Sequence, residues 1–317
     1  MLPGQRVAFK LSAWGEAIGA RPDAAIVRLS SGDTRPHGTG LIENHIAEID
    51  CPALYHQPLI TGSYAQMPSM ADFAADGVHS LSMQFYPTLL RDARQTLLNW
   101  GALNIAVSKQ GVYVRGSENE LVLPARLELK RWYSLTVTLQ GACSIELHAQ
   151  PLGVAESPRQ RRIEGGSIGE FGGAEMLLAC RRPGEQHFNG RLEAPALHAA
   201  DGEQLLAWDF AEGISSQEIH ATDSDHDGRL LQHPTRAVKG SLWDGSIQGF
   251  AQDPSQYAAI HFHEDDLTDA GWQDTVHWQV PDTLSSGVYA LKVSAGDSED
   301  YMPFFVKAVP CACQARL

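Results

Sequence analysis

Residue types that bind metals gather in one short stretch of the sequence, "AAIHFHEDDLTDAGW", which spans positions 258–272. Six candidate ligands fall within nine positions: His261, His263, Glu264, Asp265, Asp266 and Asp269. In a strand His261 and His263 project from the same face, because successive side chains alternate between the two faces. Two imidazoles suit zinc or iron, and a nearby carboxylate could complete the shell, with Asp265 as the candidate. A metal-bound water would then be a usable nucleophile near neutral pH, which suggests a small metallohydrolase.

The same stretch has a structural interpretation, which we favour. The histidines would end a strand and bond to neighbouring backbone, and "DDLTDAGW" would be an acidic turn. A second acidic stretch, "DSDHDG" at 223–228, imitates the start of a calcium loop. Its twelfth position is Pro234 instead of the glutamate that such a loop requires, so we predict a polar loop without calcium.

Composition restricts the class of protein. The chain has 317 residues, which is enough for two domains, and a net charge of −14, which disfavours nucleic-acid binding. No apolar run approaches the roughly 20 residues that a membrane span needs, and the N-terminus lacks the apolar core of a secretion signal. The five cysteines are odd in number and irregularly spaced. We therefore expect a reduced, cytoplasmic protein.

The sequence predicts that most of the elements that position these residues are strands. "RWYSLTVTLQ" and "ACSIELHAQ" alternate apolar and polar residues with a period of two and form a predicted hairpin. "TVHWQV", "SGVYALKV" and "YMPFFVK" follow later in the chain. The stretch "PTLLRDARQTLLNWG" carries the one helical stripe. The pattern predicts an all-β protein.

Loop-rich passages suggest domain boundaries. One lies near Cys51 and another runs through "RRPGEQHFNGRLEAPALHAADGEQ", with about 150 residues between them, a usual domain size. The preceding segment, 1–50, is too short to bury a core alone and should pair with strands from elsewhere in the chain.

Several phrases, in order, resemble a laminin-G or concanavalin-like jelly roll: "GSYAQMPS", "HSLSMQFYPTL", "QTLLNWG", "GVYVRGSENELVL", "KRWYSLTVTLQ" and "HFNGRLEAPALH". The resemblance covers Cys51 to about Ala200. It implies that "RWYSLTVT" is a core strand and that the closing strand runs over 188–197. It also implies that "PTLLRDARQ" is a loop and "TLLNWG" a strand, which replaces the helix suggested by periodicity.

Longer phrases resemble the large (β) subunit of N,N-dimethylformamidase. These are "AIVRLSSGDTRPHGTG", "LLAWDFAEGISSQEIHATDSDHDGRLLQHPTRAVKGSLWDG" and "YAAIHFHEDDLTDAGWQDTVHWQVPDTLSSGVYALKV". The match extends over nearly all of Met1 to Lys307. It implies a jelly roll over 51–200, inserted into a second, discontinuous immunoglobulin-like β-sandwich. Segment 1–50 would supply that sandwich's first strands, 201–309 the remainder, and 310–317 a tail.

The resemblance also implies an activity, hydrolysis of the C–N bond of small N-substituted formamides. In that family a single iron, held by tyrosines and a glutamate of a C-terminal domain, acts as a Lewis acid. This sequence reads "CACQARL" after "PFFVKAVP" and then ends, so no residue in it inherits an iron-ligand, catalytic or cofactor role.

We therefore expect a non-catalytic N-terminal part of an N,N-dimethylformamidase-like amidohydrolase. Its partners would be the missing C-terminal catalytic domain or other subunits of a hetero-oligomer, against which "HFHEDD" would pack. Two alternatives remain open. One is a free-standing module that binds carbohydrate or protein. The other is the small metallohydrolase centred on His261 and His263.

Overall fold

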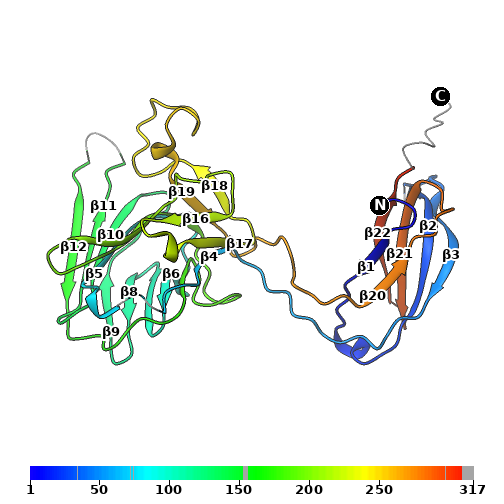
Figure 1. Cartoon of the computed structure of the whole chain (residues 1–317), viewed down its shortest axis with the longest axis horizontal. Helices are drawn as coiled ribbons and strands as arrows, with labels where there is room; N and C mark the ends of the chain where they lie inside the picture. The colour runs from blue at the N-terminus through cyan, green and yellow to red at the C-terminus, as the bar shows by residue number, and fades with distance from the viewer. Residues whose placement is uncertain (34, 72, 74, 153–155, 297, 309–317) are drawn as a thin grey trace. The chain divides into compact units, whose positions relative to one another are not determined.

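The computed structural model describes residues 1–308 except 34, 72, 74, 153–155 and 297 (Figure 1). The prediction of an all-β protein is confirmed: the described residues form 22 strands and four short 3-10 helices. The 3-10 helices span Gly15–Ala17, Ala75–Gly77, Ser224–His226 and Pro254–Tyr257. Within the described part of the chain, no helix is both long and apolar enough to cross a membrane.

The chain divides into two compact units. The smaller unit comprises Met1–Leu59 together with Asp269–Leu317, and the larger unit comprises Ile60–Thr268.

In the smaller unit, the first strands of the chain pair with the last ones. Strand β1 (Arg6–Phe9) pairs with β20 (Val276–Gln279), and a four-stranded antiparallel sheet has the order β22-β21-β2-β3. Those four strands span Ser298–Val306, Gly287–Ala295, Asp23–Asp33 and Gly40–Ile49, respectively. The ring of Phe304 lies between 5.7 and 5.9 Å from those of Phe9, Trp278 and Tyr289. The first fifty residues therefore complete their core with strands more than 200 positions away.

The larger unit contains one continuous antiparallel sheet that folds back on itself (Figure 1). Its order is β12-β11-β10-β5-β14-β15-β16-β17-β4-β13-β6-β7-β8-β9, with β19 also paired to β14 and β18 paired to β19. The strands in chain order are β4 Tyr64–Met67, β5 Ser80–Pro87, β6 Gln95–Trp100, β7 Leu103–Ser108, β8 Gly111–Arg115, β9 Glu120–Pro124, β10 Tyr133–Thr138, β11 Ser144–Ala149, β12 Arg159–Glu164, β13 Met176–Leu178, β14 Gly190–His198, β15 Gln204–Asp209, β16 Glu218–Ala221, β17 Gly228–Leu231, β18 Thr235–Val238 and β19 Ala259–Phe262.

Period-two alternation accounts for the core of the larger unit. In β5 every second residue is buried, and the hairpin β10–β11 forms in the predicted register, with Leu135 opposite Leu147 and Val137 opposite Ile145. These side chains share one apolar cluster with Trp100 of β6 and with apolar residues of β7 and β8. The strand β6 occupies "QTLLNW", where periodicity suggested a helix and the jelly-roll resemblance a strand.

The structure places both boundaries of the inserted domain differently from the prediction. We expected the inserted domain to span 51–200, but the larger unit continues to Thr268. The reason lies in long-range pairing, because β15 pairs with β14, β17 with β4 and β19 with β14. At the other end, Cys51 and Leu54 belong to the core of the smaller unit.

Candidate functional site at the end of strand β19

Strand β19 positions the two histidines singled out in the sequence. It lies between β14 and β18, so that His261 is opposite Arg191 on one side and Thr235 on the other. Ile260 and Phe262 are fully buried in the core, and His261 is half-buried on the other face. His263 follows at the next same-face position, and the two ring centroids are 4.0 Å apart.

The environment of His261 favours the neutral imidazole. Burial, together with the charges of His263 and Arg191, lowers the pKa of His261 from 6.5 to about 4. Its Nε2 lies 3.3 Å from the hydroxyl of Thr88. Near pH 7 this ring therefore acts as an uncharged hydrogen-bonding group in the fold.

His263 belongs to a network with Asp266 and Ser63. The Nδ1 atom of His263 lies 3.4 Å from Oδ2 of Asp266, and the hydroxyl of Ser63 donates to that same oxygen at 2.6 Å. The backbone N–H of His263 in turn donates to Ser63 Oγ. Here the carboxylate lies between hydroxyl and imidazole. Nucleophilic activation requires the opposite order, in which the imidazole contacts the hydroxyl. Ser63 is also fully buried, so the trio does not form a nucleophilic centre.

A third histidine, His187, joins this network, and nothing in its sequence context indicated it. Gly184 N–H donates to its Nε2 at 2.9 Å, so Nδ1 carries the proton and donates to the carbonyl of Ser63 at 3.2 Å. Burial lowers the pKa of His187. Against its ring lies Gly62, where an added Cβ would approach ring atoms to 2.5 Å, and where φ is +104°. The site thus requires a glycine at position 62.

These contacts tie together the two places where the chain crosses the boundary of the larger unit. The N–H groups of Gly62 and Ser63 donate to the carbonyls of Asp266 and His263, both at 2.9 Å. The hydroxyl of Thr61 donates to the carbonyl of Glu264, also at 2.9 Å. We call segments 61–63 and 263–266, with their mutual hydrogen bonds, the strand-end clasp. It holds the incoming and outgoing segments of a 209-residue unit side by side.

The acidic side chains of this stretch have different environments. Glu264 forms an ion pair with Arg91, and Asp265 is exposed. Glu264 and Asp265 line a cavity of about 530 Å³ together with Arg91 and His187. Among the residues that the structure describes, no group of three or more His, Cys, Asp or Glu side chains is arranged to hold a metal ion. The structure brings His261 and His263 together, whereas a metal at His261, His263 and Asp265 stays a prediction.

The iron that the family resemblance implies does not fit the clasp. Its ligands would be tyrosines and a glutamate, but the clasp contains no tyrosine and its glutamate is engaged by Arg91. We therefore assign no step of the family's chemistry to it.

The stretch "DSDHDG" uses its carboxylates internally. Asp223 accepts from the N–H of Asp225 at 3.2 Å, while Asp227 accepts from Ala221 N–H at 2.8 Å and lies 3.1 Å from His220 Nδ1. This arrangement agrees with the polar loop expected at 223–228.

The fold and the site define an all-β protein of two units, in which the strand-end clasp holds two segments of the larger unit together. Comparisons with known proteins then show what the chain is similar to. A family model described as "N,N-dimethylformamidase beta subunit-like, C-terminal" matches residues 235–316. The N,N-dimethylformamidase β subunits of Paracoccus aminophilus and an Alcaligenes species are 29% and 28% identical to the chain over 96% of its length. The chain is thus similar to N,N-dimethylformamidase β subunits, as its sequence phrases indicated.

The chain spans about half the length of these curated relatives, 47% of each. Among solved structures, a putative carbohydrate-binding protein from Bacteroides ovatus aligns with 71% of this chain and 90% of its own, at 10% identity and a TM-score of 0.41. Scytalido-glutamic peptidase aligns at 11% identity, over 76% of this chain and 97% of its own, with a TM-score of 0.24. Neither score is high enough to carry an argument about fold or ligand.

Proposed function

We propose that this chain is a non-catalytic, scaffolding part of an N,N-dimethylformamidase-like amidohydrolase, an enzyme that hydrolyses the C–N bond of small N-substituted formamides. The observation that carries the proposal is the strand-end clasp. The hydroxyls of Thr61 and Ser63 and the carboxylate of Asp266 take part in the hydrogen bonds that hold its two segments together. The match to 47% of the relatives' length supports it, because the remaining length can supply a catalytic centre.

In this proposal the partners of the chain are a catalytic domain or other subunits of a hetero-oligomer. The relatives are named β subunits, which supports assembly with further subunits. The clasp would fix where the two segments leave the larger unit. That role needs rigid geometry and uncharged or paired side chains, as found at His187, His261 and Ser63.

The test is an activity measurement. The purified chain is incubated with N,N-dimethylformamide and Fe(II), and dimethylamine release is followed, with the assembled N,N-dimethylformamidase of Paracoccus aminophilus as the positive control. We expect release by this chain to equal that of a sample without protein. Turnover that depends on the chain, and that disappears on His261→Ala, would overturn the proposal.

A further inference from the structure

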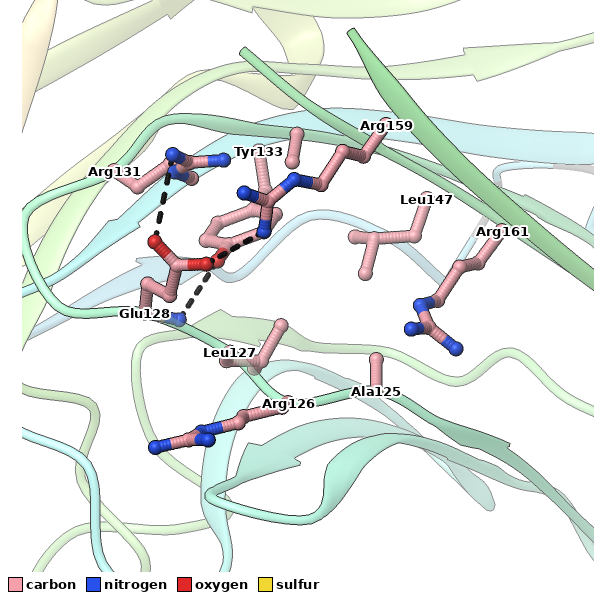
Figure 2. A pocket seen from close by; sticks show the side chains of 10 residues that line it. Ala125, Arg126, Leu127, Glu128, Arg131, Tyr133, Leu147, Arg159 and Arg161 are labelled. Carbon is pink, nitrogen blue, oxygen red and sulfur yellow. Dashed lines mark hydrogen bonds and ion pairs between the residues drawn. The ribbon is translucent and has the colours of Figure 1, made fainter. Parts of the chain in front are cut away.

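A cavity of about 470 Å³ lies within the larger unit, away from the clasp (Figure 2). One wall is the inner face of strands β10, β11 and β12, and the other is the segment 125–131 that joins β9 to β10. Figure 2 shows Leu127 and Leu147 on facing walls, and Tyr133 to one side of them, next to Glu128. These three residues, together with Ala125 and Ala149, form the apolar part of the cavity lining, and the rest of the lining is charged.

Strand register explains how arginines come to face this lining. On the edge strand β12, Arg159 lies opposite Ala149 and Arg161 opposite Leu147. Residues two apart on a strand share a face, so both guanidinium groups lie on the side of the cavity, and Arg162 lies on the other side. Ile163, the next residue on the cavity side, packs against the apolar core.

Two of the four arginines that line the cavity form ion pairs with glutamates. Arg131 is nearly fully buried, and its Nη2 contacts both carboxylate oxygens of Glu156 at 2.9 and 2.7 Å. Arg159 donates to Glu128 at 2.8 Å and forms an ion pair with Glu156 at 2.6 Å. These two arginines and two glutamates balance in charge.

The other two arginines, Arg126 and Arg161, have no ion pair or hydrogen bond from their side chains to any described residue. In addition, Nε of Arg131 is a buried donor for which the described residues offer no acceptor. A buried N–H without an acceptor requires an explanation, and a bound group is one. The cavity is therefore lined by two exposed arginines without an ion-pair partner and by Arg131, whose Nε is buried and unpaired, in a protein whose net charge is −14.

Protection of the sheet edge is the competing explanation for arginines on β12. Charged residues that point inward on an edge strand prevent pairing with other chains. That role requires charge alone, and it accounts neither for a cavity with an apolar lining nor for a buried donor. A ligand with an anionic end and an apolar body matches all three features.

We propose that this cavity binds a small organic anion in which an oxyanion, carboxylate or phosphate, is joined to a compact apolar group. The oxyanion contacts Arg161, whose planar guanidinium can engage two oxygens at once, and Arg126 adds charge at the rim. The apolar group lies against Leu127, Leu147 and Tyr133. This inference concerns a site separate from the clasp and does not depend on the proposed function.

The test uses simple probes on the purified chain, measured by titration calorimetry at low salt. The probes are benzoate, phenyl phosphate, inorganic phosphate and benzamide, the last being an uncharged counterpart of benzoate. We expect saturable binding of benzoate, phenyl phosphate or both, weaker binding of inorganic phosphate, and no detectable binding of benzamide. The stronger of the first two identifies the preferred oxyanion.

Variants then locate the bound probe. Arg161→Gln should weaken binding by about tenfold or more, the change expected for losing a charged hydrogen-bond donor. Arg126→Gln should weaken it less. Arg162→Gln is the matched control, because it removes the same charge from the opposite face of the same strand. That variant should leave the affinity within about twofold of the wild type, since Arg162 projects from the face of β12 opposite the cavity and cannot contact the probe.

Three results would overturn the proposal. The first is no saturable binding of either organic anion, which would leave the arginines as edge protection. The second is equal binding of benzamide and benzoate, which would remove the role of charge. The third is an equal loss of affinity in Arg161→Gln and Arg162→Gln, which would reduce the effect to overall charge. Thermal melting of each variant checks that it is folded.

Discussion

Arg236 of β18 offers the sharpest test of how the larger unit is held together. Its guanidinium donates to five backbone carbonyls. Nη1 bonds those of Gly213, Ser216 and Glu218 at 2.7, 3.0 and 2.7 Å, and Nη2 bonds those of Phe210 and Glu212 at 3.0 and 2.8 Å. Four of the five belong to the irregular segment between β15 and β16, and Glu218 is the first residue of β16. One side chain thus supplies hydrogen bonds that a strand ladder would otherwise provide.

The expected effect of Arg236→Gln follows from these contacts. A hydrogen bond to a charged group contributes about 1.5–3 kcal/mol, and a buried acceptor left without a donor costs about 1–3 kcal/mol. The contributions are not additive, and water can replace the donor at the two more exposed carbonyls, those of Glu212 and Glu218. We therefore expect a loss of about 3–5 kcal/mol, which is a large fraction of the stability of an ordinary domain.

Urea unfolding, followed by tryptophan fluorescence, measures this loss, and hydrogen exchange over 210–218 localises it. The control is Arg229→Gln, which removes an exposed arginine that bonds a single side chain, Gln66, at 2.8 Å. We expect the control to lose less than about 1 kcal/mol. If Arg236→Gln loses no more than the control, and exchange over 210–218 is unchanged, the reasoning is refuted.

Three further changes test the polar groups inside the larger unit. Ser63→Ala should lower the free energy of unfolding by about 1–3 kcal/mol, because the Asp266 carboxylate loses its donor; an unchanged urea midpoint would contradict this. Burial lowers the pKa of His261 to about 4, so its contribution to stability is present above pH 6.5 and is lost as pH falls toward 4. His261→Gln should therefore flatten the acid limb of the stability curve, whereas the exposed control His45→Gln should not. Burial raises the pKa of Glu193, so its contribution is full below pH 4.5 and falls as pH rises through the raised pKa. Glu193→Gln should accordingly gain melting temperature relative to wild type between pH 4 and pH 7, and a parallel pH profile would count against it.

Local patterns in the sequence predicted the strands whose one face is buried. Tyr133, Leu135 and Val137 alternate with polar residues, and the structure buries all three in β10. Val276 and Trp278 behave alike in β20. Alternation succeeds there because burial on one face is a local requirement that each strand meets with its own side chains.

Such local patterns could not predict which distant strands pair with each other. The strands β15 to β19 alternate no differently from those of the smaller unit, so nothing local assigns them to the larger one. Their partners, among them β4 and β14, lie up to 167 positions away along the chain, the separation of Leu231 from Tyr64. The same limit applies to sites. "HFHEDD" drew attention by composition, but its partners Ser63 and His187 are remote in sequence and have unremarkable neighbours.

The cavity lined by arginines is a second site that the sequence did not predict. "RQRRIE" reads as an exposed, highly charged segment, and most of its residues are exposed. Only the pairing of β12 with β11 shows that Arg159 and Arg161 share a face with Ala149 and Leu147. The sequence shows the arginines of this segment, but it does not show that two of them lie opposite Ala149 and Leu147.

The central claim is that His261 of β19 and His263, which follows that strand, have a structural role at the strand-end clasp and do not form a metal centre. Its most direct test is the metal content of the purified chain after incubation with Fe(II) or Zn(II) and removal of the unbound ion, measured by inductively coupled plasma mass spectrometry. We predict well below one equivalent of either metal, with no difference between the wild type and a His261→Ala, His263→Ala double variant. One equivalent of iron or zinc that is retained by the wild type and lost in the double variant would contradict the account.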